Sequence, residues 1–318
     1  MDCEVSENME SFRATFLRCL YKHLPFNLKG DLDLGIANHQ INRSPDCPLL
    51  LSCIINFYGR IPLLEGILFS LTEQRLSKDI LEVILVEDRG GTEEGKEIAR
   101  RFSRYLNIKY YSLTENFGLM GYSRNFGLSR ALGKYILFLD DDTVILEEDF
   151  LSKLIDEFET TGADALIPEG MASYNLINGR YGFHEPYFPS SRCMAYTREV
   201  LLELGGFVSA MIGQEDVEFT IRFIAAGRRY HRSERLKYLH PPLIMDNLNK
   251  AKAVGISFAG LKGRYPFFIW LLLIINGGRF LPKLLFPFSL KWKMQGRFSL
   301  GFLMGIIQGL GGIKTDYI

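Results

Sequence analysis

Three consecutive carboxylates, Asp140, Asp141 and Asp142, directly follow an apolar run, and their spacing suits the binding of a cation. The run from Tyr135 to Leu139 has no polar alternation, which predicts a strand buried on both faces in the middle of a mostly parallel sheet. Because side chains alternate along an extended chain, Asp140 and Asp142 can point the same way while Asp141 points elsewhere. Two carboxylates on one side repel each other unless a cation lies between them. Mg²⁺ and Mn²⁺ prefer such oxygen ligands, completed by water and substrate phosphates.

The same acids have a second interpretation that needs no metal. Asp142 or Thr143 could cap a helix predicted over Glu147 to Ile155. Acid clusters are common at helix starts, because the N-terminus of a helix favours negative charge. The neighbouring elements therefore have to decide between a metal site and a helix cap.

Apolar strands alternate with helices on the N-terminal side of these acids. The predicted strands are Pro48 to Asn56, Leu81 to Val86 and Ile108 to Leu113, and the predicted helices are Ile61 to Glu73, Glu93 to Tyr105 and Tyr122 to Leu132. This alternation indicates βαβ crossovers and a parallel sheet. Ligands of such sheets bind at the carboxyl ends of the strands, where Tyr58, Asp88 and the Asp140/Asp142 pair would gather. No GxGxxG or GxxxxGK[ST] loop is present, so we expect phosphates to be held through a metal.

Composition indicates one large domain with an appendage of different character. The 318 residues carry no net charge, yet ten bases and a single acid, Asp316, lie from Lys250 onward, which leaves that segment at +9 and the preceding part at −9.

The five cysteines form no CxxC pair, and the acidic N-terminus lacks a signal-peptide pattern, which favours reduced thiols in the cytoplasm. We predict an N-terminal helix (Met9 to Leu24) and arm over 1–47, a catalytic domain over 48–245 and a C-terminal helical extension over 246–318.

Further motifs follow in a fixed order, and together with the acids they resemble the family 2 glycosyltransferases between about Leu50 and Pro241. The matching segments, in chain order, are Tyr58 and Arg60 in the first turn, Glu87-Asp88 as the paired acids, Asn116-Phe117-Gly118, Ser123-Arg124-Asn125-Phe126-Gly127, Ala131 to Ile136, Asp140-Asp141-Asp142 as the DxD motif, Gly205-Gly206-Phe207, Glu215-Asp216 with Arg222 and Gly227, and His240. Asn56, Gly59 and Glu87 depart from the family's residues at their positions. Each motif is weak alone, but their shared order and spacing favour the metal interpretation of the acids.

The resemblance implies a GT-A fold, a Rossmann-like mostly parallel sheet flanked by helices, and transfer of a sugar with inversion. It implies that Asp140 and Asp142 hold Mn²⁺ or Mg²⁺ against a nucleoside diphosphate, with His240 as a further ligand or a phosphate contact. A surface role before two prolines is the alternative for His240. The residues implied in binding the nucleotide-sugar are Tyr58, Arg60, Asp88, Arg124 and Asp141. Asp88 could accept a base N–H and Arg124 could meet base or phosphate, while a turn-capping role next to Gly90 is the alternative for Asp88.

Asp216, in the Glu215-Asp216 pair, is the residue that the resemblance implies as general base. An acceptor hydroxyl must lose its proton as it attacks from the face opposite the leaving group, and a carboxylate opposite the metal suits that task. The alternative is that Asp216 caps the helix that follows it. A nucleotidyltransferase is a competing interpretation of the whole chain. Such an enzyme should carry a glycine-rich, basic turn after its first strand, and residues 56–60 do not fit that description well. A non-catalytic scaffold is a further competing interpretation. Such a scaffold would be expected to have lost one of the acids, and all of them are present here.

The expected partners are a UDP-, GDP- or dTDP-sugar donor and a glycan or lipid-linked acceptor, with no nucleic acid. From Tyr265 onward the apolar runs are interrupted by prolines, glycines and bases, so we expect none to reach the roughly 20 residues that span a bilayer. A basic, apolar tail suits anionic lipid headgroups, which predicts peripheral attachment to the cytoplasmic face of the membrane. The alternative is a helical subdomain packed on the catalytic domain or on a second copy in a homodimer.

Overall fold

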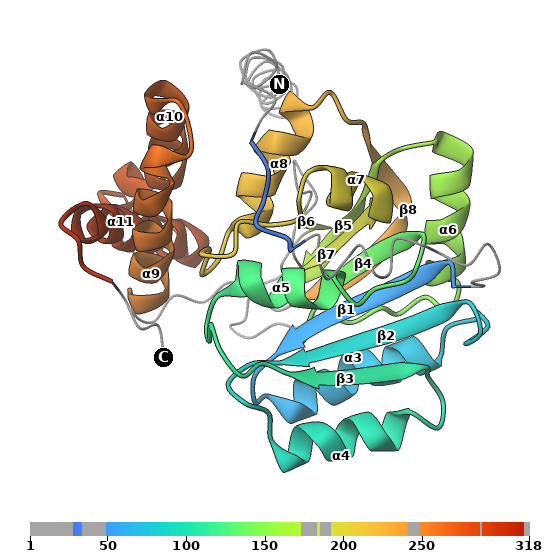
Figure 1. The fold of residues 1–318 in the computed structure, drawn as a ribbon. Helices are drawn as coiled ribbons and strands as arrows, with labels where there is room; N and C mark the ends of the chain where they lie inside the picture. The colour runs from blue at the N-terminus through green and yellow to red at the C-terminus, as the bar shows by residue number, and fades with distance from the viewer. Residues whose placement is uncertain are drawn as a thin grey trace.

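The computed structural model describes residues 28–33, 49–172, 183–184, 192–240, 248–286 and 288–314. The helix predicted over Met9 to Leu24 lies outside these ranges, as does most of the predicted arm. Within them, an eight-stranded sheet has helices on both faces, and the C-terminal helices form a group beside it (Figure 1).

The sheet has the strand order β3-β2-β1-β4-β7-β5-β6, and β8 pairs with β5. The strands are β1 (Leu51–Phe57), β2 (Leu81–Glu87), β3 (Ile108–Ser112), β4 (Tyr135–Asp140), β5 (Ala165–Ala172), β6 (Phe183–His184), β7 (Cys193–Thr197) and β8 (Tyr230–His240). Strands β1 to β4 pair in parallel, as predicted, while β7 runs antiparallel between β4 and β5. A buried apolar strand has the same composition in either direction, so the sequence could not reveal the reversal.

The register of the parallel strands places their carboxyl ends level with one another. Phe57 of β1 lies opposite Glu87 of β2, and Asn56 lies opposite Asp140 of β4. The residues that follow each strand therefore emerge at one edge of the sheet. Because β8 ends at His240, and β8 and β4 are joined through β5 and β7, the late histidine also reaches this edge.

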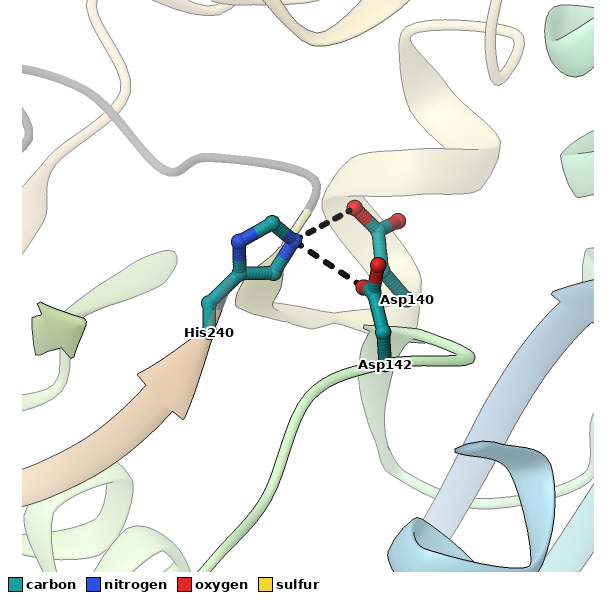
Figure 2. Close-up of side chains that lie close together, drawn as sticks. All are labelled: Asp140, Asp142 and His240. Atoms are coloured by element: carbon teal, nitrogen blue, oxygen red, sulfur yellow. Dashed lines mark ion pairs between the residues drawn. The ribbon is translucent and has the colours of Figure 1, made fainter. Parts of the chain in front are cut away.

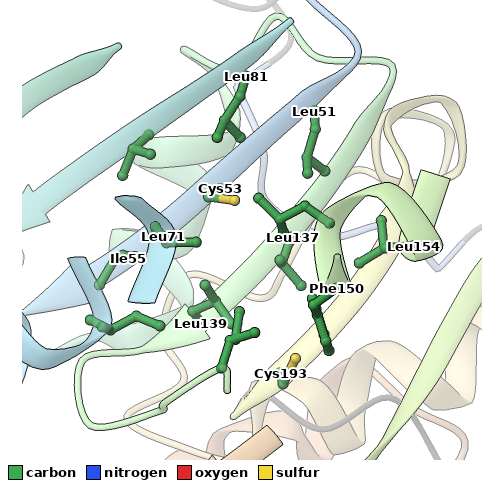
Figure 3. Packing of buried hydrophobic residues seen from close by; sticks show 14 of the residues in the cluster. Leu51, Cys53, Ile55, Leu71, Leu81, Leu137, Leu139, Phe150, Leu154 and Cys193 are labelled. Carbon is green, nitrogen blue, oxygen red and sulfur yellow. The ribbon is translucent and has the colours of Figure 1, made fainter. Parts of the chain in front are cut away.

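Helices cover both faces of the sheet and follow the amphipathic pattern of the sequence. They are α3 (Ile61–Thr72), α4 (Glu93–Phe102), α5 (Met120–Leu128), α6 (Phe150–Thr161), α7 (Arg198–Glu203) and α8 (Glu215–Ala225). Residues of α3, α4 and α6 pack against one face, which includes Leu51, Cys53 and Leu137 (Figure 3). Residues of α5, α7 and α8 pack against the opposite face, which includes Ile54, Ile136 and other alternate residues of the same strands. Alternation along β1 and β4 thus separates two apolar cores.

The helix predicted over Glu147 to Ile155 begins later than expected, which bears on the helix-cap alternative for the acids that precede it. Asp149 is at the N-cap position of α6, and Thr143 donates its hydroxyl hydrogen to the carbonyl of Arg192. Asp142 and Thr143 therefore do not cap this helix, and that alternative for the triple acid is wrong.

The C-terminal extension consists of α9 (Asn249–Gly260), η1 (Leu261–Gly263), α10 (Phe267–Gly278), η2 (Leu281–Leu284) and α11 (Leu290–Leu310). Its apolar core includes Val254, Phe258 and Phe302, and it continues into Met211 and Ile221 of the sheet domain. The hydroxyl of Tyr265 donates to the buried Glu218 carboxylate of α8. The extension therefore shares one core with the domain that carries the sheet.

One stretch of the extension, Phe267–Leu284, has the length and hydropathy of a membrane span, with 28% of it buried in the structure. The sequence predicts no run of roughly 20 uninterrupted apolar residues, and this 18-residue stretch is interrupted by Arg279, Pro282 and Lys283. The α-helix within it ends at Gly278, and a turn separates it from η2. Length and hydropathy alone are weak evidence, because the core helix of a soluble protein passes the same test.

The described part of the N-terminal arm, residues 28–33, makes specific backbone contacts that its polar sequence does not predict. The N–H groups of Gly30 and Leu32 donate to the carbonyls of Leu204 and Gly205. Asp31 accepts the N–H of Ser209 and pairs with Arg264 of the extension. The arm thus joins the Gly205-Gly206 loop to the C-terminal helices.

Candidate active site

Asp140, Asp142 and His240 come together at the carboxyl edge of the sheet (Figure 2). The Nε2 atom of His240 lies 3.0 Å from Oδ1 of Asp142 and 3.6 Å from Oδ2 of Asp140. One ligand atom from each residue lies within 4.8 Å of the others. Two carboxylates and one imidazole at this separation match the ligand types that Mn²⁺ accepts, and they leave room for water or phosphate oxygens.

The electrostatics of this cluster show why the three side chains stay together. Burial favours the neutral form of each group, but the hydrogen bonds between His240 and the two carboxylates, together with the charges around them, outweigh it. The pKa of His240 is raised, and the pKa values of Asp140 and Asp142 are lowered. A cationic partner therefore stabilises the two ionised acids, and a divalent cation would satisfy the same requirement.

Asp141 lies outside this group of three residues. Its carboxylate lies 3.2 Å from Nη1 of Arg60, while the other end of that guanidinium pairs with Asp142. Burial, together with the charges of Asp142 and Asp140, raises the pKa of Asp141 to about 7, against the opposing effect of Arg60. The Arg60 side chain remains 48% exposed, so one face of its guanidinium can still meet a ligand.

Arg124 lies behind the cluster and joins it to helix α8. The Arg124 residue is 1% exposed. Its guanidinium lies 3.0 Å from Oδ1 of Asp140 and 2.7 Å from Oε1 of Glu215. Glu215 is also buried, and burial raises its pKa to about 7 against the opposing charge of Arg124. In this structure Arg124 supports two carboxylates, so its predicted contact with base or phosphate would require the side chain to change partners.

Asp216, the predicted base, is the second residue of α8 and is 7% exposed. The N-cap position belongs to Gln214, so Asp216 does not cap this helix, although its Oδ1 accepts the N–H of Val217. Against the effect of burial, the charges of Glu215, Asp140 and Asp216 raise the pKa of Arg124, and burial together with the charge of Asp216 raises the pKa of Tyr196. The Asp216 carboxylate is therefore within electrostatic reach of Arg124.

Asp88 and Tyr58 lie at the same sheet edge, on the far side of β1. Oδ2 of Asp88 accepts the N–H of Gly118 at 2.8 Å, and Oδ1 accepts the N–H of Arg89. Tyr58 is 50% exposed and lies beneath the guanidinium of Arg89. An exposed ring beside a carboxylate that retains acceptor capacity is suited to a planar base. The backbone contacts of Asp88 also fit its alternative role as a turn-forming acid.

Several residues that carry the family resemblance hold the architecture instead of facing the cluster. The side-chain amide of Asn125 donates to the carbonyl of Phe207 and accepts its N–H, each at 2.8 Å. The buried guanidinium of Arg222 donates to the carbonyls of Leu204 and Gly206. Glu87, which replaces the family's first paired acid, is buried and bonds Thr92. These contacts fix the Gly205-Gly206-Phe207 loop and the turn after β2.

Sequence reasoning missed Arg192 and the structural role of Glu215. The positive charge of Arg192 lowers the pKa of Asp140, and its carbonyl accepts the N–H of Asp140. Its closeness to the site depends on the antiparallel placement of β7 beside β4. In the sequence Glu215 is only the acid that precedes Asp216, and nothing local pairs it with Arg124.

The family model described as Glycosyl transferase family 2 matches residues 52–215, which is more than half of the chain. The chain belongs to this family. The matched range contains β2, which Asp88 follows, and β4, which ends at Asp140. It stops at Glu215, the first residue of α8, so Asp216 and His240 lie beyond it. The resemblance drawn from the motifs is therefore confirmed.

Two curated relatives show how far the similarity extends. The chain is 33% identical over 97 residues to the poly(ribitol-phosphate) beta-N-acetylglucosaminyltransferase TarS of Staphylococcus aureus, covering 30% of this chain and 17% of TarS. It is 27% identical over 165 residues to the UDP-Gal:alpha-D-GlcNAc-diphosphoundecaprenol beta-1,3-galactosyltransferase of Escherichia coli, covering 46% of this chain and 57% of that enzyme. The chain thus spans only part of each relative, and TarS is several times longer than the matched region.

Solved structures show the same fold at low identity. The mannosyltransferase PcManGT of Pyrobaculum calidifontis, in complex with GDP-Man and Mn²⁺, has a TM-score of 0.59 at 14% identity and covers 96% of this chain and 97% of its own. Residues 1–349 of Staphylococcus aureus TarS, in complex with UDP-GlcNAc, have a TM-score of 0.53 at 17% identity and cover 83% of this chain and 92% of that one. These likenesses confirm the predicted GT-A type of fold, including C-terminal helices.

Proposed function

We propose that this protein transfers a sugar from a nucleotide-sugar to an acceptor hydroxyl with inversion at the anomeric carbon, in the synthesis of a cell-wall or other surface glycan. The observation that carries the proposal is the cluster of Asp140, Asp142 and His240 at the edge of the sheet, in a chain of this family. UDP-GlcNAc and GDP-Man are the nucleotide-sugars named with the solved structures of the same fold. We infer that 48–245 is the catalytic unit and 246–318 its extension.

The chain's own residues would bind and orient the donor from two sides. Asp88 and Tyr58 would receive the base by hydrogen bonding and stacking, and the half-exposed Arg60 would contact phosphate oxygens. Asp140, Asp142 and His240 would hold Mn²⁺ or Mg²⁺. A divalent ion bound there supplies Lewis-acid stabilisation of the negative charge that develops on the departing nucleoside diphosphate.

Asp216 is proposed as the general base that takes the proton from the acceptor hydroxyl. It starts helix α8 next to Glu215, whose pairing with Arg124 ties this helix end to Asp140. The buried Arg124 guanidinium thus links the end of the helix that carries Asp216 to Asp140, which we propose as a metal ligand. A single displacement needs such an arrangement, because base and leaving group act on opposite faces of the sugar.

The acceptor is proposed to be lipid-linked or a growing glycan at the cytoplasmic membrane surface. The relative from Escherichia coli is named for a diphosphoundecaprenol-linked acceptor. The segment from Lys250 onward carries ten bases and one acid, which suits an anionic surface. These two observations support a peripheral location for the catalytic domain.

The experiment that tests the function is a screen of purified protein against UDP-, GDP- and dTDP-sugars, with and without Mn²⁺. A ligand that binds only the native state raises the melting temperature, so the true donor should stabilise the protein in the presence of Mn²⁺. The stabilising donor is then incubated with candidate acceptors, and the configuration of the product is read by NMR. Stabilisation by no nucleotide-sugar, or a product with retained configuration, would contradict the proposal.

A further inference from the structure

Five large apolar side chains stand exposed together where η2 meets α11. We name Leu285, Phe286, Phe288, Leu290 and Trp292 the aromatic turn. Their exposed fractions are 75%, 60%, 80%, 38% and 38%, in that order. Exposing several aromatic and aliphatic side chains side by side is unfavourable in water, and such patches mark binding surfaces.

Contacts within the aromatic turn hold these rings in one place. The rings of Phe286 and Phe288 stack with centroids 6.0 Å apart, and Phe288 meets Trp292 edge-on at 5.6 Å. Ser289 accepts the N–H of Trp292 and caps α11. The rings are therefore presented as a group at the start of a 21-residue helix.

The charge around the aromatic turn has a single sign. Nζ of Lys283 lies 5.0 Å from the centroid of the Trp292 ring, and Lys293 follows that tryptophan directly. Between Leu248 and Lys314 the sequence contains ten Lys and Arg residues and no Asp or Glu. An occupant of this surface must accept apolar rings and supply negative charge at the same time.

We propose that the aromatic turn enters the headgroup layer of an anionic phospholipid bilayer and so attaches the enzyme to the membrane. Aromatic rings are favoured at the membrane interface, and neighbouring bases meet the negative lipid headgroups. This deepens the proposed function, on which it rests for the location of the acceptor.

A second copy of the chain fits the same surface less well. A two-fold dimer built on this turn would bring the same basic segment of both copies together, and like charges facing each other oppose association. A membrane-spanning role for α10 also fits less well, because Ile269, Trp270 and Leu273 are buried in the core of the extension. The indole N–H of Trp270 is satisfied there by the carbonyl of Phe258.

The test is flotation of the full chain with vesicles of phosphatidylglycerol or phosphatidylcholine. The variant carries Phe286→Ser and Phe288→Ser, and the matched control carries Phe267→Ser and Phe268→Ser, which removes two rings of similar exposure from the start of α10. We expect wild type to float with anionic vesicles, the variant to bind at least tenfold more weakly and the control to bind like wild type. High salt should weaken wild-type binding only in part, because inserted rings are not screened by ions.

Two results would overturn the inference: absence of wild-type flotation with either vesicle, or equal loss of binding in the variant and the control. A dimer seen by sedimentation that disappears in the variant would assign the turn to a second copy instead. The thermal shift given by donor and Mn²⁺ separates this inference from the function. If the shift persists while flotation fails, only the membrane contact is wrong; if flotation succeeds while no donor binds, only the transfer reaction is wrong.

Discussion

Asp142 has two protein partners that belong to different parts of the site. One of its oxygens faces His240, and the other pairs with Arg60 of the turn after β1. Asp141, the residue before Asp142, pairs with Arg60 and not with His240. Neighbouring carboxylates of the same chemistry thus face different surroundings, and each can serve as the control for the other.

We expect Asp142→Asn to weaken Mn²⁺-dependent binding of a nucleoside diphosphate much more than Asp141→Asn does. The amide of asparagine keeps the shape of the side chain and removes the charge that a divalent cation needs. Isothermal titration with UDP or GDP, each with and without Mn²⁺, measures the difference. Equal effects of the two changes would show that the cluster with His240 is not the metal site.

Asp216→Asn tests the base. Loss of a positioned general base typically costs about 10²–10⁴-fold in rate, so we expect turnover to fall by that factor while donor binding is kept. The comparison is made with the donor found in the thermal screen, under saturating conditions. Near-normal turnover in this variant would assign the base to another residue.

Arg124→Ala tests whether the buried guanidinium supports the fold or binds nucleotide. Removing it leaves the buried Glu215 without its cationic partner, which typically costs about 3–5 kcal/mol of unfolding free energy, and leaves Asp140 with His240. Urea unfolding measures this, with Arg100→Ala as a control that removes an exposed ion pair and should leave stability nearly unchanged. Unchanged stability of Arg124→Ala together with weaker donor binding would instead favour the nucleotide contact.

At the scale of elements, the space around two helical glycines shows how closely α5 approaches the sheet. A Cβ atom at Gly127 of α5 would lie 2.6 Å from Cγ2 of Ile54, whereas one at Gly66 of α3 would meet nothing within 4 Å. We expect Gly127→Ala to lower the unfolding free energy by about 1–3 kcal/mol through overpacking. Gly66→Ala should raise it by roughly 0.5–1 kcal/mol, because alanine favours the helix. Urea midpoints of the two variants should move in opposite directions; a shift in the same direction would contradict this packing.

The sequence predicted the elements up to β4 to within four residues at each end, because each is an apolar run or an amphipathic helix with a clear stop. The alternation along β4 also predicted that Asp140 and Asp142 share a side. The reversed direction of β7 and the pairing of Arg124 with Glu215 were not predictable, since both depend on contacts between segments far apart in the chain. The polar arm at residues 28–33 was missed for the same reason, because its contacts are made by backbone groups that any sequence carries.

At the scale of the molecule, the extension is a part of the folded body. Val208, Met211 and Ile221 of the sheet domain lie in the same apolar core as α9 and α11. Tyr265 reaches back to Glu218, which also binds the buried Arg222. Deleting the extension would expose this core, so substitutions at the surface are the cleaner way to separate membrane contact from folding.

Two cysteines of the sheet allow the rate of its local unfolding to be measured. Cys53 in β1 and Cys193 in β7 are free and almost fully buried, and burial raises the pKa of both thiols, so neither is ionised at neutral pH. Thiol reagents attack the thiolate and need access, so each cysteine should be alkylated only when its part of the sheet opens. Mass spectrometry of peptides from timed reaction with N-ethylmaleimide measures the two rates separately. Equal rates would mean that the parallel and antiparallel halves open as one unit, and faster reaction of Cys193 would mean that the half carrying β7 opens first and alone.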